Sequence, residues 1–154
     1  VVSNEYKDGR GVITFDRSLD RVGVSTFAFN DKIVSVTLPK SVTVIEMMAF
    51  HSCLQLSEVV LGDGVKTIGE DAFAGCSSLQ SIDLGSGVEL IGKRAFHECN
   101  TIVGIICRAE TPPTVEYLKL PEEITIYAPQ KMVKLYKKAM GWSNYAKRIK
   151  RIKE

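Results

Sequence analysis

The sequence has few of the residues that most often carry chemistry. Its 154 residues include two histidines, four cysteines and one tryptophan. No apolar run approaches the roughly 18–20 residues that a transmembrane helix needs. The chain opens VVSNEYKDG, which lacks the basic segment and the apolar block of a signal peptide. We therefore predict no transmembrane segment, and either a cytosolic protein or a mature or truncated form of an exported one.

Basic residues are scarce in most of the chain and concentrated at its end. Residues 1–130 carry 11 Lys/Arg and 17 Asp/Glu, whereas residues 131–154 carry nine Lys/Arg and one Glu. The net charge of +2 thus combines an acidic body with a basic tail. A solvated helix end explains the tail, and contact with a membrane or an acidic surface is the alternative. A nucleic-acid arm usually interleaves aromatic with basic residues and follows a basic body, so we predict no nucleic-acid partner.

The sequence does contain a clear internal repeat. The stretch VVLGDGVKTIGEDAFAGC (59–76) returns as IDLGSGVELIGKRAFHEC (82–99), and it is preceded at the same interval by VTLPKSVTVIEMMAFHSC (36–53). A degenerate copy begins near Gly11, with Phe15 aligned with Leu38. One such unit cannot bury its own apolar face, so neighbouring units must stack.

Each repeat predicts the same short elements. Leu56, Val59 and Leu61 have the L-x-x-L-x-L spacing of a leucine-rich repeat, and they predict a short strand with alternate side chains inward. A turn with Gly or Pro follows, and then a second extended segment with Val65 and Ile68. The next Ala-Phe pair predicts a single helical turn. Stacking then predicts a ladder of Phe27, Phe50, Phe73 and Phe96 beside a ladder of Cys53, Cys76 and Cys99.

The repeat weakens after Ile102. Pro112-Pro113 stops a strand, residues 124–127 predict another, and residues 130–142 have helical apolar spacing. A solenoid needs its open end covered, so we predict a cap here. The expected fold class is an α/β repeat: a leucine-rich-repeat solenoid with a 23-residue period, short parallel strands and a C-terminal strand-plus-helix cap. We expect a single domain over residues 1–154, with a lead-in (1–10, including an Asp8-Gly9 turn), repeats (11–107) and a cap (108–154).

The repeat resembles the BspA-like class of leucine-rich repeats, found largely in bacterial surface proteins. Residues 59–79 match its hallmark, V-x-L-P-x-x-V-x-x-I-G-x-x-A-F-x-x-C-x-x-L, almost throughout. GRGVITFDRSL (9–19) resembles the opening of such arrays, and LYKKAMGWSNYA (135–146) resembles their closing segment. Glu46 in place of Gly and Asn30 in place of Cys depart from the pattern.

The resemblance implies a location and a general role. We expect a secreted or cell-surface bacterial protein that acts in adhesion or host contact, as a monomer, through a protein or glycan ligand. The alternative is a structural spacer that presents another domain of a longer surface protein. Neither hypothesis requires a cofactor, a metal or an enzymatic activity.

The repeat explains most of the residues that could suggest chemistry. The glycines at 62, 64, 85 and 87 lack the Lys-Ser/Thr of a phosphate-binding loop and serve as turns. His51 and His97 are two repeats apart, about 10 Å, which is too far to share a metal. We expect buried free thiols at the cysteines, although a bridge between adjacent repeats is geometrically conceivable. Glu70 or Asp71 should pair across the stack with Lys93 or Arg94.

What remains for a partner is the outer face of the strands. Residues between the inward positions should form a shallow, mildly acidic surface, and repeat proteins commonly bind across such a face. The candidate partner-binding residues are Ser35, Thr37, Glu58, Val60, Ser81, Asp83 and Ile106.

Overall fold

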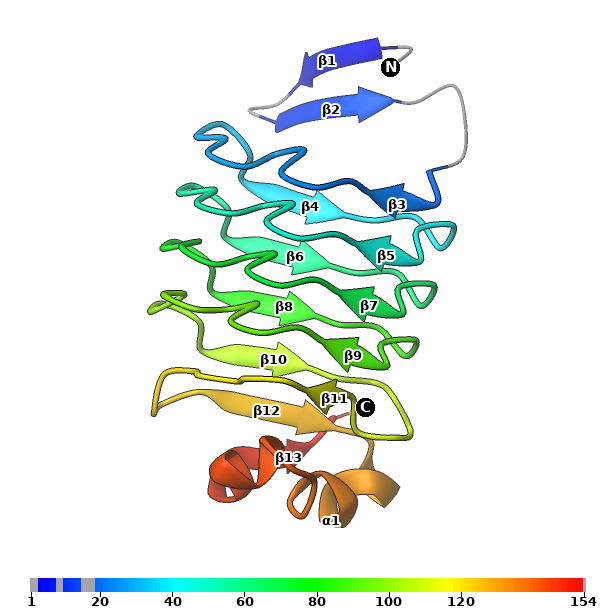
Figure 1. Cartoon of the computed structure of the whole chain (residues 1–154), viewed down its shortest axis with the longest axis vertical. Coiled ribbons are helices and arrows are strands. Elements are labelled where there is room, and N and C mark those ends of the chain that lie inside the picture. The colour runs from blue at the N-terminus through cyan, green and yellow to red at the C-terminus, as the bar shows by residue number, and fades with distance from the viewer. Residues whose placement is uncertain (1–2, 8–9, 15–18, 154) are drawn as a thin grey trace.

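The computed structural model describes residues 3–7, 10–14 and 19–153, with side chains from residue 19 onward. The predicted Asp8-Gly9 turn and the alignment of Phe15 lie outside the described residues. From residue 19 the chain winds as a solenoid whose successive turns stack along the long axis of the molecule (Figure 1). Within the described ranges, no helix is both long and apolar enough to span a bilayer.

The larger sheet has six parallel strands and confirms the predicted short strands. Ser35 pairs with Glu58, Glu58 with Ser81, and Ser81 with Gly104, so each turn of the solenoid advances the register by one predicted period. Side chains alternate across a strand, which turns Val36, Val59, Ile82 and Ile105, the middle residues of the four repeat strands, inward. In chain order the strands are β4 (Ser35–Thr37), β6 (Glu58–Val60), β8 (Ser81–Asp83), β10 (Gly104–Ile106), β12 (Thr125–Ala128) and β13 (Ile149–Arg151).

The second predicted extended segment forms a separate sheet of five parallel strands. Arg21 pairs with Val44 and Val44 with Thr67, so this sheet repeats with the same period as the first. The repeat that begins the array is therefore present from residue 19, as the alignment predicts. The strands are β3 (Arg21–Val22), β5 (Val44–Ile45), β7 (Thr67–Ile68), β9 (Leu90–Ile91) and β11 (Thr114–Val115).

The N-terminal segment differs from the prediction. A strand is present at β2 (Arg10–Thr14), where residues 11–15 predict one, but it pairs antiparallel with β1 (Ser3–Lys7). These two strands form their own sheet and are not part of the parallel ladder. The predicted polar lead-in thus contains a strand. An adjacent segment is an easy antiparallel partner, because such a pair needs only a short connection.

The Ala-Phe segment is not a helical turn. Met48 and Ser52 have φ of 57° and 54°, and Asp71 and Arg94 repeat this conformation in the next two turns. These left-handed residues are incompatible with a right-handed helix. The N–H groups alternate instead between local turns and the next repeat: the Ala49 N–H bonds to Glu46 O, whereas the Phe50 N–H bonds to Ala72 O at 2.8 Å. This third side of the solenoid therefore has its own ladder between repeats.

The predicted phenylalanine ladder forms the centre of the core. The rings of Phe50 and Phe73 stack with centroids 5.2 Å apart, Phe27 stacks on Phe50 at 5.2 Å, and Phe96 stacks on Phe73 at 5.8 Å. Phe50 and Phe73 are buried, and Phe27 is partly buried at the N-terminal end. The rings contribute both buried area and aromatic stacking to the contact between neighbouring turns.

The four cysteines are free and buried, as predicted. The Cys76 thiol donates to the carbonyl of Phe50 at 3.2 Å, and the Cys99 thiol donates to the carbonyl of Phe73 at 3.1 Å. Each bond joins a thiol to the Phe of the preceding turn, so the cysteine ladder is tied to the phenylalanine ladder. The cysteines thus act as small core residues with one weak hydrogen bond.

The segment after residue 107 covers the end of the array, and a C-terminal strand-plus-helix is present. It contains η1 (Gln130–Met132), α1 (Val133–Tyr136) and η2 (Trp142–Arg148) beside β12 and β13. The Trp142 Nε1–H donates to the carbonyl of Pro113 at 2.8 Å, and the Tyr136 hydroxyl donates to the carbonyl of Ala109 at 2.9 Å. Because β11, β12 and β13 continue the two sheets, the ladders extend into the segment expected to be only a cap.

Glycine at residues 64 and 87, in the turns of two repeats, is required by the close approach of the preceding turn. A Cβ at Gly87 would overlap the carbonyl oxygen of Asp63 in the preceding turn, whereas a Cβ at Gly104 would have no atom within 4 Å. We expect Gly87→Ala to lower the free energy of unfolding by about 1–3 kcal/mol, because backbone must move to admit the methyl group. Urea denaturation measures this. The control Gly104→Ala should leave stability nearly unchanged, and equal losses in both variants would contradict the explanation.

Candidate binding face

All seven predicted residues lie on the outer face of the six-stranded sheet. The pairing aligns them in two rows that run along the solenoid axis. The first row is Ser35, Glu58, Ser81, Gly104 and Thr125, and the second is Thr37, Val60, Asp83, Ile106 and Tyr127. The side chains between the rows point into the core: Val59, Ile82 and Ile105 are at most 1% exposed. The structure thus brings the predicted residues together as one continuous surface.

The two rows differ in exposure and chemistry. Ser35, Thr37 and Glu58 are exposed, whereas Val60 and Ile106 are half-buried and present apolar surface. A shallow hollow lies at the N-terminal end of this face. Its lining residues are Val34, Ser35, Val36, Thr37, Ser57, Glu58 and Val60. Four predicted residues therefore share one depression in which a carboxylate lies beside an aliphatic side chain.

Asp83 is engaged in the structure rather than free on the face. The Arg108 guanidinium donates to its carboxylate from Nη2 at 2.8 Å and from Nε at 3.0 Å, and the Gly85 N–H donates to its Oδ1 at 3.0 Å. These bonds to Asp83 raise the pKa of Arg108. Asp83 is paired, and Glu58 has no ion-pair partner among residues 19–153. The surface is therefore less acidic than its sequence suggests.

Sequence reasoning missed Thr125 and Tyr127, which extend the two rows beyond β10. The strand itself was predicted, but Gly104 pairs with Thr125, whereas the repeat period would align Gly104 with Tyr127. The fixed period therefore gives the wrong register for this strand. Alternation within the strand could have identified the two residues, since buried Ile126 lies between two partly exposed neighbours.

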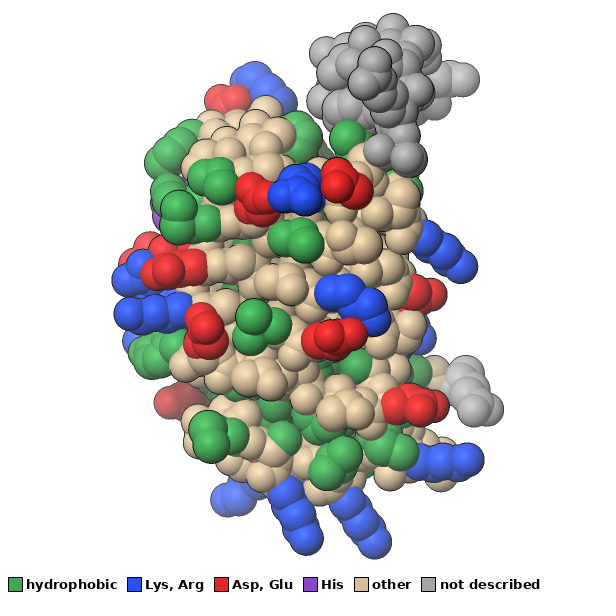
Figure 2. All heavy atoms as spheres, turned by 45° about the vertical axis from the view of Figure 1, so that its right-hand side comes forward, with side chains coloured by type: hydrophobic (Ala, Val, Ile, Leu, Met, Phe, Trp, Pro, Cys, Tyr) green, Lys and Arg blue, Asp and Glu red, His purple; other side chains and the backbone are tan. Residues whose placement is uncertain are grey.

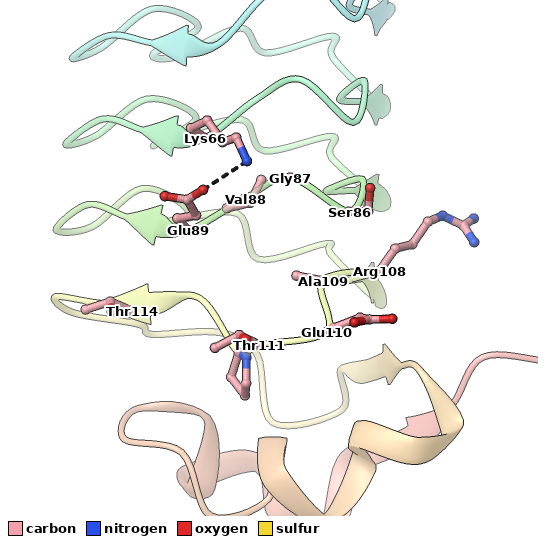
Figure 3. A pocket seen from close by; sticks show the side chains of 11 residues that line it. Lys66, Ser86, Gly87, Val88, Glu89, Arg108, Ala109, Glu110, Thr111 and Thr114 are labelled. Atoms are coloured by element: carbon pink, nitrogen blue, oxygen red, sulfur yellow. Dashed lines mark ion pairs between the residues drawn. The ribbon is translucent and has the colours of Figure 1, made fainter.

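A second hollow lies between the turn at residues 85–89 and the segment 108–114. Lys66 and Glu89 meet at its side with an ion pair of 2.9 Å, and the side chains of Arg108 and Glu110 point away from it (Figure 3). Its lining residues are Lys66, Ser86, Gly87, Val88, Glu89, Arg108, Ala109, Glu110, Thr111, Pro112 and Thr114. The hollow is polar, and the Lys66–Glu89 ion pair at its side links two neighbouring turns.

The Cys53 and Cys107 thiols are held in their unreactive, protonated form. Interaction with the Cys76 thiol and burial raise the pKa of Cys53, and burial raises the pKa of Cys107. Both thiols therefore stay protonated at neutral pH, although a nucleophilic cysteine needs a lowered pKa. Among residues 19–153, no group of three His, Cys, Asp or Glu side chains could hold a metal ion.

The charges on the Ala-Phe side pair across the stack, as predicted. Arg94 donates to Asp71 at 2.7 and 3.0 Å and to Glu70 at 3.2 Å. Lys93 takes a different role, since its backbone N–H donates to Glu116 at 3.0 Å. These charges therefore hold neighbouring turns in register, at about 0–1 kcal/mol for a partly exposed pair.

Comparisons with known proteins agree with this architecture. A family model described as "BspA type Leucine rich repeat region" matches residues 10–118 in six copies. The match extends past residue 107, consistent with the continuing ladders. Leucine-rich repeats of this kind generally serve as interaction surfaces rather than as enzymes. No curated protein matches the chain.

Two solved bacterial structures are similar to the chain. A leucine-rich repeat protein from Bacteroides ovatus is 29% identical over 71% of this chain, with a TM-score of 0.53. A leucine rich cell surface protein from Faecalibacterium prausnitzii is 23% identical over 90% of this chain, with a TM-score of 0.58. The chain spans 25% and 30% of the lengths of these two proteins.

Proposed function

Because the chain belongs to the BspA-type leucine-rich repeat family, we propose that it is a non-enzymatic binding module of a secreted or cell-surface bacterial protein. Its ligand is a protein or glycan, and the module acts in adhesion or host contact as a monomer. The observation that carries the proposal is the continuous outer face of the six-stranded sheet. Seven predicted residues align there in two rows. Among residues 19–153, Asp83 is the one of the seven whose side chain bonds to another part of the solenoid.

The chemistry of the face supports a protein or glycan partner. Val60 and Ile106 offer apolar contact, Glu58 offers a charge, and the hydroxyl groups of Ser35 and Thr37 offer hydrogen bonds. The backbone beneath them is fixed by parallel pairing, so little order has to be gained on binding. This arrangement favours a flat or extended ligand laid along the solenoid axis.

The proposal predicts a ligand on an array of extracellular host proteins and glycans. We expect the wild-type chain to give at least one saturable signal that the double variant Val60→Lys/Ile106→Lys loses. Both side chains lie outside the core, so the variant should melt at the wild-type temperature. The alternative role, a structural spacer for another domain, predicts no saturable signal. A signal that the folded double variant fully retains would contradict binding through this face.

A further inference from the structure

The C-terminal end of the solenoid carries a second surface that the binding face does not explain. Residues 131–153 contain nine Lys/Arg. Among residues 19–153, only Arg148 of these nine forms an ion pair, with Glu123 at 3.2 Å. The other eight are exposed. Figure 2 shows basic side chains projecting from this end of the molecule beside hydrophobic groups.

The helical segment around α1 separates a buried side from a basic side. Tyr136 is fully buried beneath the segment, where its ring meets Trp142 with centroids 5.5 Å apart. Lys131 in η1, Lys134 in α1 and Lys138 in the turn that follows are exposed. Their intervals of three and four residues are those that bring side chains to one side of a helix. The buried residues anchor the segment, so this row of lysines is held on a fixed support.

Two exposed apolar side chains occur in the same segment as these lysines. Leu135 is 48% exposed, and Met140 is 87% exposed in the turn before Gly141. Gly141 has φ of 78°, a conformation that reverses the chain and leaves Met140 outside the core. Exposed apolar groups beside lysines suit a lipid interface, where the apolar groups enter the acyl region and the lysines remain at the headgroups.

We propose that this cap surface, defined by Lys131, Lys134, Leu135, Lys138 and Met140, docks on a membrane rich in anionic phospholipid. The charge distribution favours an end-on orientation. Residues 1–130 carry a balance of −6 and residues 131–154 a balance of +8, so an anionic surface attracts the cap and repels the body. The cap lies at one end of the long axis (Figure 1), and end-on docking leaves the sheet face free.

Vesicle sedimentation of the whole chain tests this surface. We expect binding to vesicles of phosphatidylcholine with phosphatidylglycerol, weak binding to phosphatidylcholine alone, and release at high salt. Lys134→Gln/Lys138→Gln should weaken binding roughly 30-fold, since each lysine near an anionic bilayer contributes about 1 kcal/mol. The matched control Lys40→Gln/Lys93→Gln, with the same charge change on the body, should alter binding less than about twofold.

Met140→Ser separates a lipid surface from other polyanions. We expect it to weaken vesicle binding roughly tenfold, as a buried thioether side chain is lost, and to leave binding to immobilised heparin unchanged. Equal binding to both kinds of vesicle would overturn the proposal. The proposal would also be overturned if Met140→Ser bound vesicles as tightly as wild type and the lysine variant lost heparin binding. That pair of results would assign the surface to an acidic glycan. If the array of host proteins and glycans gives no signal, that result contradicts binding by the sheet face and leaves the cap proposal unaffected.

Discussion

Replacing Phe73 with alanine is expected to lower the free energy of unfolding by about 3–5 kcal/mol, the range for truncating a buried aromatic residue. Phe73 is fully buried and stacks on both Phe50 and Phe96. The substitution removes two ring contacts and leaves a cavity in the middle of the ladder. Neighbouring rings cannot close this cavity without breaking the register of the sheets. Urea denaturation followed by circular dichroism measures the loss.

Phe29 offers a matched control for the ladder. It is 68% exposed and forms a T-shaped contact with the His51 ring, 5.3 Å between centroids, outside the stack. Phe29→Ala should change stability by less than about 0.5 kcal/mol, as is usual for surface substitutions. If Phe73→Ala were as stable as wild type, the phenylalanine ladder would not be what stabilises the core.

Replacing Trp142 with alanine is also expected to cost about 3–5 kcal/mol. Its indole is fully buried, meets Tyr136 edge-on and donates to the carbonyl of Pro113 at 2.8 Å. The loss combines a cavity with an unpaired buried carbonyl. The indole joins η2 to the segment before β11, so we expect the C-terminal end to open first. Thermal melts report the loss, and hydrogen exchange locates it.

An exposed residue close to Trp142 provides the comparison. Met140 is 87% exposed, so Met140→Ala should melt at nearly the wild-type temperature. Trp142→Phe keeps most of the ring but loses the hydrogen bond, and should fall between the two variants. Destabilisation by Met140→Ala as large as that by Trp142→Ala would contradict the structure of the cap.

Much of the fold could be predicted because the repeat constrains the same positions in every turn. Leu56, Val59 and Leu61 recur with one period, and a position that is inward in one turn must be inward in the next. The Phe and Cys ladders and the Arg94 pairing with Glu70 and Asp71 follow from the same stacking. These predictions depend on local spacing alone, and the structure confirms them.

The errors occurred where backbone conformation and pairing, rather than the spacing of apolar residues, decided the structure. The conformation of the Ala-Phe segment depends on left-handed residues such as Met48 and Arg94, whose side chains do not favour that conformation over a helix. At the N-terminus, β2 pairs with β1 although its sequence aligns with β4. In the cap, the pairing of Gly104 with Thr125 sets a register for β12 that the period does not give. In each case backbone pairing with a neighbour decided the structure, and this information is not present in residue spacing.

The candidate face could be located but not given a ligand. Stacking constrains the residues that point into the core. Ser35, Glu58 and Val60 point away from the core, so stacking does not constrain their identity. Their positions therefore follow from the period, and their chemistry does not. Asp83 illustrates the limit, because its pairing with Arg108 depends on a residue outside the predicted set.

Whether the ligand binds on the outer face of the six-stranded sheet is tested most directly by comparing the dissociation constants of variants on and away from that face. Val60 lies on the sheet face, whereas Met47 is an exposed apolar residue, 45% accessible, in the turn after β5. For a ligand obtained from the array, Val60→Lys should weaken binding by roughly tenfold or more, and Met47→Lys should leave it unchanged. Unchanged affinity in Val60→Lys together with loss in Met47→Lys would place the ligand off this face and contradict the account.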